Sequence, residues 1–506
     1  MHVTKLSRAV GLACSAMAAT SAFAVDASNY NQPTANTRDI YISGASAQDN
    51  GILAMLLQEC VSGSLTRYSI NNNFAYICTT AATLNVGQPQ VAVFKYSVGG
   101  SGSGVTPVNA TTPLPFLSMS SIIANCNVAA VVTTFGTLTQ PYNNVVCPEA
   151  NSAILAGNNV GARLGLSDVE PSFFGNAATT SNLTTKSAIA TLIFGVPVSR
   201  NIYKALQSQQ ILNIGNCTNT ASSVSAPIWE YSNECMPSLS RSQIVSAFTA
   251  SGVTWASIRV LSNLVDDTIY VARRVNSSGT QKTFEAIVTG SPNGDGFKSC
   301  MVETDPFRDP DTGDVVNGDV ASACSSTTAP SVVFAGSGGS NVRNCLIAHN
   351  NNNRGAIGML TAEELAGATT NWRFLKISGD RTGTDGPTVD RGYAPTHADV
   401  AAGRYQFWTI ASLNYTSATA NTAALVGLPG YIGANGFINR FRFQFADPVG
   451  LAIAQPFGPS GLMANWDLQA GNPALNFTGS TGVNPWSRKV GGATLNNCQI
   501  GKGANL

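Results

Sequence analysis

One stretch of the sequence combines residue types that can bind an anion. Residues 269–288 read Ile-Tyr-Val-Ala-Arg-Arg-Val-Asn-Ser-Ser-Gly-Thr-Gln-Lys-Thr-Phe-Glu-Ala-Ile-Val. Two arginines follow a short apolar run, and a Ser-Ser-Gly-Thr turn follows the arginines. A guanidinium beside the free N–H groups at the start of a helix is an arrangement that binds oxyanions. The alternative is an ordinary capped helix with two surface arginines.

The elements that would position these residues are a strand, a turn and a helix. Residues 269–272 form an apolar run of strand type, and apolar residues recur at helical spacing from Phe284. We expect Ser278 or Thr280 to cap the helix. Gly279 would let the backbone come close to whatever lies at the start of the helix.

Two further segments place a small or hydroxyl-bearing residue directly after a strand. Residues 39–47 form a short strand that breaks at Gly44, and Ser46 lies in the turn before a helical pattern. Ser46 could equally be a simple N-cap. Residues 91–105 alternate and then become rich in glycine around Ser101. Such a turn can hold an anion with its N–H groups, and it lacks the Gly-Lys-Ser/Thr ending of a nucleotide-binding loop.

The composition indicates an exported globular protein. The chain has 506 residues, of which 11% are charged and 44% hydrophobic, and its formal net charge is +1. This balance indicates neither a nucleic-acid-binding surface nor a polybasic membrane patch. The length allows a large core and two or more domains.

The N-terminal segment, residues 1–24, has the pattern of a secretory signal. Two basic residues precede a run of small apolar residues, and Ala22-Phe23-Ala24 matches the small-x-small cleavage pattern. We therefore expect a periplasmic or secreted protein that begins at Val25. A lipoprotein alternative would use Cys14, but Gly11 stands where the lipobox usually has Leu.

The cysteines indicate disulfide bonds. An even number remains once the signal, with Cys14, is removed. An even count in an exported chain favours a disulfide framework. We expect neighbours to pair, such as Cys60 with Cys78 and Cys217 with Cys235. No Cys-x-x-Cys pair is present and the chain has 3 histidines, so we expect neither a zinc site nor a redox site.

Taken in order, several motifs resemble those of phosphate-specific periplasmic binding proteins from bacterial ABC importers. The loop after the arginines resembles the family's Arg-x-Asp-Gly-Ser-Gly-Thr…Phe anion loop, and residues 239–258 resemble its Leu-Thr-x-x-Gln-Ile…Trp-x-x-Ile helix and turn. Residues 44–46 are similar to Gly-Ala-x-Thr/Ser, residues 96–105 to Tyr-x-x-x-Gly-Ser-x-x-Gly-Val, and residues 162–171 to a strand end that carries an aspartate. Three structural motifs also match in order, at residues 354–360, 372–379 and 395–405.

The resemblance implies an anion site shared by two lobes. One lobe would contribute Ser46, Ser101 and Asp168, with Ser103 as the substitute for Ser101, and the other would contribute Arg274, Asn276, Ser278, Gly279 and Thr280. By register, Arg273 faces away from the site. The family has aspartate where this chain has Asn276, so we expect Arg274 to be held more loosely.

Asp168 would select phosphate over sulfate in such a site. A carboxylate can accept a hydrogen bond from a P–OH group. Sulfate has no proton at neutral pH, so the same carboxylate repels it. Without the other motifs, Asp168 would read as an exposed aspartate in a turn.

We predict an α/β, two-lobed type II periplasmic-binding-protein fold with long disulfide-bridged insertions. Residues 25–187 and 351–506 would form the first lobe and residues 188–350 the second. The insertions lie at 106–160 and 290–330. Within the latter, residues 305–314 are rich in acidic side chains, but the glycine spacing breaks the EF-hand pattern and favours a solvated turn over a calcium site.

The predicted function is extracytoplasmic binding of inorganic phosphate, or a similar protonated oxyanion, by hinge closure and without catalysis. We expect no cofactor, no metal and no nucleic acid, a monomer, and the membrane permease of an ABC importer as a partner. The alternative is a secreted structural or adhesive protein that reuses the fold and contacts partners through its insertions. An enzyme such as a phosphatase ranks third, because nothing resembles a metal cluster or a nucleophile with its base.

Overall fold

The structure is a computed structural model. It describes residues 25–30, 36–135, 138–148, 158–175, 182–210, 233, 235–290, 320–328, 330–364, 366, 370–378, 392–416, 436–446, 462–465, 483–490, 494–498 and 502–503. The predicted signal, Cys217 and the acidic loop at 305–314 lie outside the described residues, so these remain predictions. No helix in the described part is both long and apolar enough to cross a membrane.

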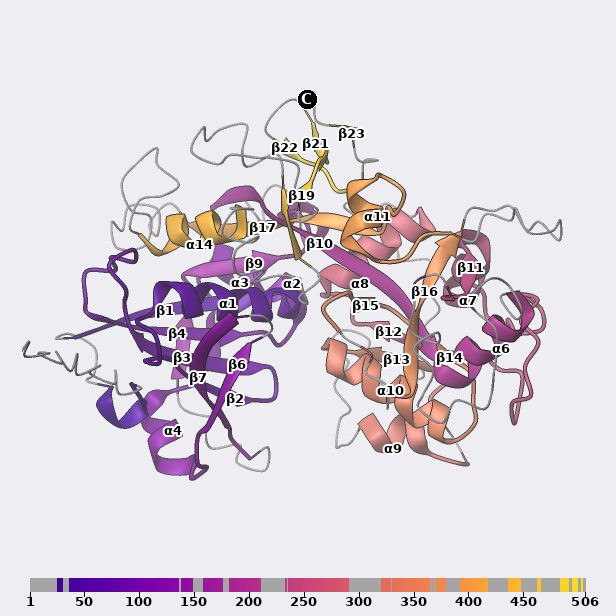
Figure 1. The fold of residues 1–506 in the computed structure, drawn as a ribbon, viewed down its shortest axis with the longest axis horizontal. Coiled ribbons are helices and arrows are strands. Elements are labelled where there is room, and N and C mark those ends of the chain that lie inside the picture. Colours follow the sequence, from indigo (N-terminus) through magenta and orange to yellow (C-terminus); the bar gives the residue numbers. More distant parts are fainter. Residues whose placement is uncertain are drawn as a thin grey trace, which may run out of the picture.

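The first lobe is built on a mixed sheet with β1 (Thr37–Gly44) near its centre (Figure 1). β1 pairs in parallel with β4 (Gln90–Tyr96) and with β9 (Leu164–Ser167). Beyond β4 the sheet continues through β3 (Asn73–Thr79), β2 (Thr66–Ile70), β7 (Leu138–Val146) and β6 (Val131–Phe135). Beyond β9 it continues through the antiparallel strands β17 (Trp408–Thr416) and β10 (Leu183–Ser199).

β1 and the helix after it follow from the sequence pattern. Ile40 and Ile42 alternate along β1 and are buried against the core. The strand ends at Gly44, whose φ of 111° lies in the region that favours glycine. Helix α1 (Asp49–Glu59) then buries the residues predicted at helical spacing, among them Ile52 and Met55.

The second lobe has its own sheet. β12 (Tyr270–Arg274) pairs in parallel with β13 (Val333–Gly336) and β14 (Ala356–Gly358). β14 and β16 (Trp372–Ser378) both pair with β10, and β16 pairs with β11 (Ser238–Ser240). The helices of this lobe include α6 (Arg200–Gln210), α7 (Arg241–Thr249), α9 (Val320–Ser325) and α10 (Gly339–Asn351).

The long strand β10 belongs to both sheets. Its first part pairs with β17 in the first lobe, and its last residues pair with β14 and β16 in the second (Figure 1). Strands β14 and β16 lie in the second sheet, whereas the predicted boundary at residue 351 assigned them to the first lobe. A strand pattern in the sequence predicts a strand, but it does not say which sheet the strand joins.

The remaining described elements are short. They are η1 (Ala27–Asn29), η2 (Ser46–Gln48), α2 (Gly100–Ser103), α3 (Thr106–Ala110), β5 (Pro113–Phe116), α4 (Met119–Asn125), β8 (Asn158–Gly161), η4 (Pro171–Phe173), α8 (Gly279–Phe284), η6 (Glu285–Thr289), β15 (Leu360–Thr361), α11 (His397–Ala401), α14 (Phe437–Ala446), β18 (Leu462–Asn465), β19 (Val483–Asn484), β20 (Trp486–Ser487), β21 (Lys489–Val490), β22 (Thr494–Leu495) and β23 (Lys502–Gly503).

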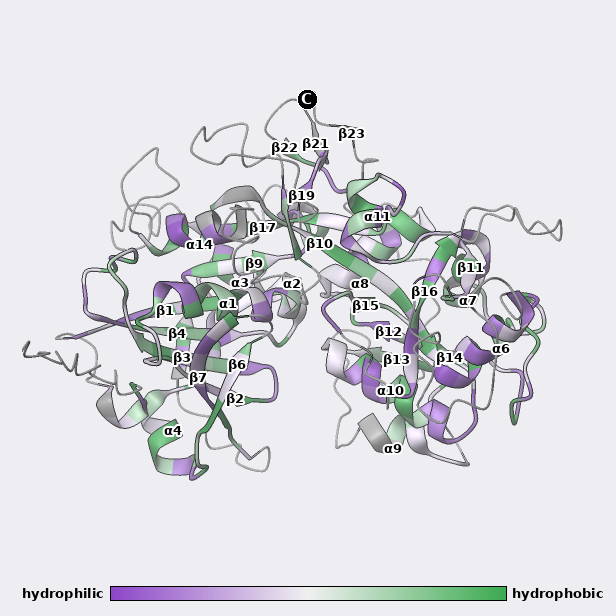
Figure 2. Cartoon of the chain, in the orientation of Figure 1, coloured by the Kyte–Doolittle hydropathy of each residue, from purple (hydrophilic) through white to green (hydrophobic). Residues whose placement is uncertain are grey.

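Hydrophobic packing and disulfides hold the lobes together internally. Figure 2 shows hydrophobic residues along β10 and β14 and polar residues along the outer helix α6. The predicted bond between Cys60 and Cys78 is present. Two more neighbour pairs are bonded, Cys126 with Cys147 and Cys324 with Cys345. The two-lobed α/β class with disulfide-bridged insertions is confirmed.

Candidate functional site

The predicted site residues follow the ends of strands that face the other lobe. β1, β4 and β9 are parallel, so their carboxyl ends lie at one edge of the first sheet. Ser46 follows β1, Ser101 lies on α2 after β4, and Asp168 follows β9 directly. In the second lobe, α8 follows β12 in the same way. α2 and α8 are in contact, which brings segments far apart in the sequence together (Figure 1).

Ser101 and Asp168 are joined within the first lobe. The Oγ of Ser101 accepts a hydrogen bond from the backbone N–H of Asp168 at 3.0 Å. Both side chains are buried. The substitute considered from the sequence, Ser103, instead donates from its Oγ to the carbonyl oxygen of Gly100 within its own turn at 2.8 Å. Ser101 is therefore the hydroxyl of this loop that faces Asp168.

Gly279 of the second lobe lies directly against this pair. A Cβ atom at Gly279 would overlap the Ser101 Oγ and lie 2.7 Å from the Oδ2 of Asp168. Real Cβ atoms essentially never come this close to another heavy atom, so any larger residue would push the lobes apart. Beside this contact, the N–H of Gly102 donates to the carbonyl oxygen of Ser277 at 2.8 Å. Three of the predicted site residues, from both lobes, thus meet at one place.

Arg274 is buried and fixed by the backbone. Its Nε donates to the carbonyl oxygen of Gly336 at 3.1 Å, and its Nη2 donates to that of Ser337 at 2.7 Å. Its Nη1 lies 3.5 Å from the Oγ1 of Thr280. Burial lowers the pKa of Arg274 to about 10, an effect that the nearby Asp168 opposes. The group therefore stays charged at neutral pH, and two carbonyls and a hydroxyl orient it.

The expectation that Asn276 would hold Arg274 loosely is wrong. The Oδ1 of Asn276 accepts from the Nη1 of Arg273 at 3.4 Å and from the Nε2 of Gln281 at 3.0 Å. Asn276 is only partly buried and lines a pocket of about 770 Å³ beside the contact between the lobes. The end of β13, rather than the residue at 276, positions Arg274.

The capping prediction for α8 is also wrong. Ser278 stands at the N-cap position, but its side chain makes no capping hydrogen bond. Its buried Oγ has no hydrogen-bond partner among the described residues. Thr280, in the first turn, points its hydroxyl toward Arg274. Neither hydroxyl caps the helix. Both hydroxyls can therefore form hydrogen bonds with a ligand, as can the N–H groups of the first turn.

Ser46 lies on the turn η2 and is partly exposed. The turn is held against β9 because the N–H of Ala45 donates to the carbonyl oxygen of Leu166 at 2.9 Å. Gln48, the last residue of the turn, is fully buried beside Asp168. The turn that carries Ser46 therefore reaches Asp168 through Gln48.

Sequence reasoning missed a buried ion pair behind this turn. The Nζ of Lys95 lies 3.2 Å from the Oδ1 of Asp49 and donates to the Ser97 Oγ at 2.6 Å. It also donates to the carbonyl oxygens of Gly44 at 2.7 Å and Ala45 at 3.3 Å. Lys95 therefore fixes the backbone of the Ser46 turn and places a positive charge beneath it. The signal in the sequence is a lysine inside an apolar strand, since buried lysines are rare unless paired.

Asp168 is a buried acid whose surroundings shift its pKa. Burial raises its pKa to about 6, while Arg274, Ser101 and Gln48 act in the opposite direction. At neutral pH the carboxyl is therefore mostly ionised and can accept a hydrogen bond. A shift of this kind, caused by burial together with a specific charge, is common at functional sites.

A second polar contact crosses between the lobes. The Nδ2 of Asn50, on α1, donates to the Oε2 of Glu363 at 3.1 Å. Thr361 of β15 donates to the other oxygen of the same carboxyl at 3.1 Å. Burial raises the pKa of Glu363 well above its ordinary value, and the nearby carboxyls of Glu364 and Asp49 raise it further. The lobes are thus joined by hydrogen bonds at two separate places.

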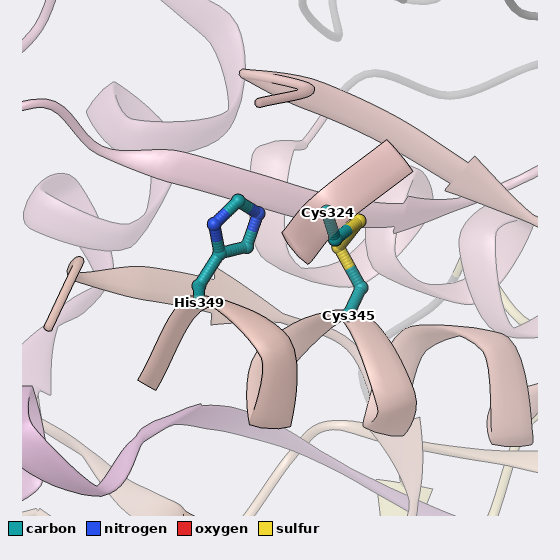
Figure 3. A group of neighbouring side chains, drawn as sticks. All are labelled: Cys324, Cys345 and His349. Atoms are coloured by element: carbon teal, nitrogen blue, oxygen red, sulfur yellow. A yellow bond between two sulfur atoms is a disulfide. The ribbon is translucent and has the colours of Figure 1, made fainter. Parts of the chain in front are cut away.

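One group of metal-ligating residue types lies away from this site. Among the described residues, Cys345 and His349 of α10 come together with Cys324 of α9 (Figure 3). The two cysteines are joined in a disulfide, so they offer no thiolates. The ring of His349 stacks on Tyr270 at 4.4 Å, and burial lowers its pKa to about 3. The disulfide and the stacked rings are contacts of the packed interior.

Comparisons with known proteins give structural matches only. No protein-family model matches the chain, and no curated protein matches it. A structure search matches an ABC-type phosphate transport receptor from Vibrio cholerae, which is 12% identical with a TM-score of 0.36 and covers 84% of this chain and 100% of the receptor. It also matches a possible phosphate binding protein from Planctomyces limnophilus, 12% identical with a TM-score of 0.31 over 76% of this chain and 84% of that one.

A phosphate binding protein from Stenotrophomonas maltophilia is 13% identical, with a TM-score of 0.30 over 58% of this chain and 77% of that one. Matches at such TM-scores carry no information about the ligand of this chain.

Proposed function

We propose that this protein binds inorganic phosphate, or a similar protonated oxyanion, between its two lobes and closes over it. The observation that carries the proposal is the meeting of Ser101 and Asp168 of one lobe with Gly279 of the other. It brings a hydroxyl, a carboxylate and the start of a helix to one point. The charge of Arg274 acts on the same carboxyl, as its effect on the pKa of Asp168 indicates.

Each group has a task in holding the ion. Arg274 uses Nε and Nη2 on two carbonyls, which leaves guanidinium N–H groups for anion oxygens. Ser278, Thr280 and the N–H groups at the start of α8 donate to further oxygens. Asp168 accepts a hydrogen bond from the P–OH group, which sulfate lacks. The ion is gripped and released, and no covalent bond forms or breaks.

Closure is the second part of the proposal. β10 continues from one sheet into the other, so a change of backbone angle along it would move one lobe against the other. Two interlobe hydrogen bonds of the described residues, Gly102 with Ser277 and Asn50 with Glu363, would form as the lobes come together.

This function implies a place and a partner. Disulfides such as Cys60–Cys78 form and persist in an oxidising compartment, which supports a periplasmic or secreted protein. The permease of an ABC importer is the partner that would receive the ion from a monomeric binding protein.

Thermal unfolding in two salts tests the proposal. A ligand that binds only the folded state raises its stability by RT ln(1 + [L]/Kd), about 4 kcal/mol at a thousandfold excess over Kd. Phosphate should therefore raise Tm well above the value in sulfate of equal ionic strength. Equal Tm values in the two salts would overturn the proposal.

An adhesive role is the second candidate, and one observation favours it. Val131 and Val132 on β6 are 64% and 69% exposed, on a strand that carries no charged side chain. Exposed, uncharged strands of this kind can pair with a strand of another protein. Adhesion that is lost in Val132→Lys, without any anion-dependent change in Tm, would favour this role.

A further inference from the structure

The side-chain amide of Gln48 is buried and makes no hydrogen bond of normal geometry among the described residues, although it lies close enough to Asp168 to act on that carboxyl. Gln48 ends the turn that carries Ser46, and its exposed fraction is 0%. Neither its Oε1 nor its Nε2 makes a hydrogen bond of normal geometry with any residue that the structure describes. A buried amide without partners is costly, so an unpaired one in a folded protein calls for an explanation.

Two other buried polar atoms of the candidate site share this property. The Oδ1 of Asp168 and the Oγ of Ser278 also have no partner in the described part of the chain. The amide of Gln48 lies beside that carboxyl and lowers its pKa as a hydrogen-bond donor, at a geometry outside that of a normal hydrogen bond. Ser278 precedes Gly279, which packs on Asp168. The unpaired donors and acceptors therefore come from three segments and both lobes, and they gather around one carboxyl.

We propose that Gln48 is a further ligand-contacting residue, which donates from Nε2 to an anion oxygen and accepts a ligand O–H at Oε1. The proposal rests on the phosphate-binding function proposed above. A ligand that satisfies both atoms must carry both an ionised oxygen and a hydroxyl. Hydrogen phosphate and its close analogues have both groups, and sulfate has only the first. Gln48 would thus strengthen the selection made by Asp168 without adding charge.

Calorimetry of Gln48→Met tests this role. Methionine has a similar length and no amide, so the variant should bind inorganic phosphate about tenfold more weakly. The Tm of its ligand-free form should be unchanged or higher, because an unpaired amide has been removed from the interior. A residue with only a structural role would instead lower that Tm.

Gln58→Met is the matched control. Gln58 lies on α1, roughly 13 Å further along the helix, and also has a buried Nε2 without a partner in the described residues. This variant should bind phosphate as the unaltered protein does. An equal loss of affinity in both variants would overturn the role of Gln48.

Gln48→Glu is the second test. A carboxylate beside Asp168 repels the anion, so the affinity at pH 8 should fall at least tenfold below that of Gln48→Met. Unchanged affinity in both Gln48 variants, while Arg274→Ala loses binding, would overturn this inference alone. An unaltered protein that binds no phosphate would overturn both this inference and the proposed function.

Discussion

The backbone N–H of Gly102 donates to the carbonyl oxygen of Ser277 at 2.8 Å, which ties helix α2 of the first lobe to the loop before α8 of the second. The bond lies beside the contact of Gly279 with Ser101 and Asp168. It sets how close the lobes come, and so fixes the size of the site between them. The predictions below follow from this closed arrangement.

Gly279→Ala should block closure. The added methyl group would overlap the Ser101 Oγ and lie 2.7 Å from an oxygen of Asp168, so the lobes must stay apart. Because an anion then meets one lobe at a time, we expect its affinity to fall by about a hundredfold or more. Calorimetry with phosphate measures the loss.

Gly252→Ala is the control for a glycine outside the site. Its φ is 73° and an added Cβ would contact nothing within 4 Å, so the change should cost about 1 kcal/mol of unfolding free energy and leave affinity unchanged. If Gly279→Ala bound phosphate with unchanged affinity, the closed contact would have no part in binding.

The adjacent arginines should behave differently. Both are 3% exposed, but Arg274 faces the site while Arg273 donates to Asn276. Arg274→Ala removes the charge that binds the anion, and we expect at least a thousandfold loss of affinity, since a charge-assisted pair of hydrogen bonds is lost. Arg273→Ala should keep the affinity even if its Tm falls. The opposite ranking of the two affinities would show that the register of β12 is misassigned.

The stability of the ligand-free closed protein should depend on pH through Asp168. Burial raises the pKa of this carboxyl from 3.8 to about 6. The folded state therefore holds the proton more tightly than the unfolded chain. Its contribution to the free energy of unfolding should be full below pH 4 and should be lost as pH rises to about 6, by up to about 3 kcal/mol.

Asp168→Asn should remove that dependence. Urea unfolding of both proteins at pH 4, 5, 6 and 7 measures it, and the variant should become more stable than the unaltered protein as pH rises. Parallel stability curves for the two proteins would mean that Asp168 is not buried as an acid in solution.

Lys95→Met should destabilise the first lobe. It leaves the mostly buried Asp49 without its counter-charge and removes the donor to the Gly44 and Ala45 carbonyls. We expect a loss of about 3 kcal/mol in the free energy of unfolding, together with weaker phosphate binding. Urea unfolding measures the first and calorimetry the second.

The double variant Lys95→Met with Asp49→Leu is the matched comparison. It replaces both charges with apolar groups and should recover most of the stability, though not the affinity. If the single and double variants were equally unstable, the ion pair would not be the cause.

The sequence predicted the strands and turns that carry the candidate site residues better than it predicted the hydrogen-bond partners of those residues. The breaks at Gly44 and Gly279 are local features, because a glycine after a strand fixes where the turn lies. Ser101 lies in a glycine-rich turn that the residues themselves indicate, whereas Asp168 is assigned through the resemblance of residues 162–171 to a family motif; each follows a parallel strand of the first sheet. These parts depend on neighbours in the sequence.

The parts that failed depend on residues far apart in the chain. Asn276 pairs with Arg273 because the end of β13, some sixty residues later, already holds Arg274. The pairing of Lys95 with Asp49, and of β16 with the second sheet, likewise joins distant segments. The residues next to each partner in the sequence do not indicate these distant contacts, because the contacts form only when the chain packs into its fold.

The measurement that tests the central claim most directly is calorimetric titration of the mature protein with phosphate and with sulfate, at pH 8. We predict one phosphate per chain, with micromolar or tighter affinity, and no measurable heat from sulfate. Asp168→Asn should bring the two affinities closer together, because the acid that rejects sulfate is gone. Absence of phosphate binding, or equal affinity for both anions in the unaltered protein, would contradict the account.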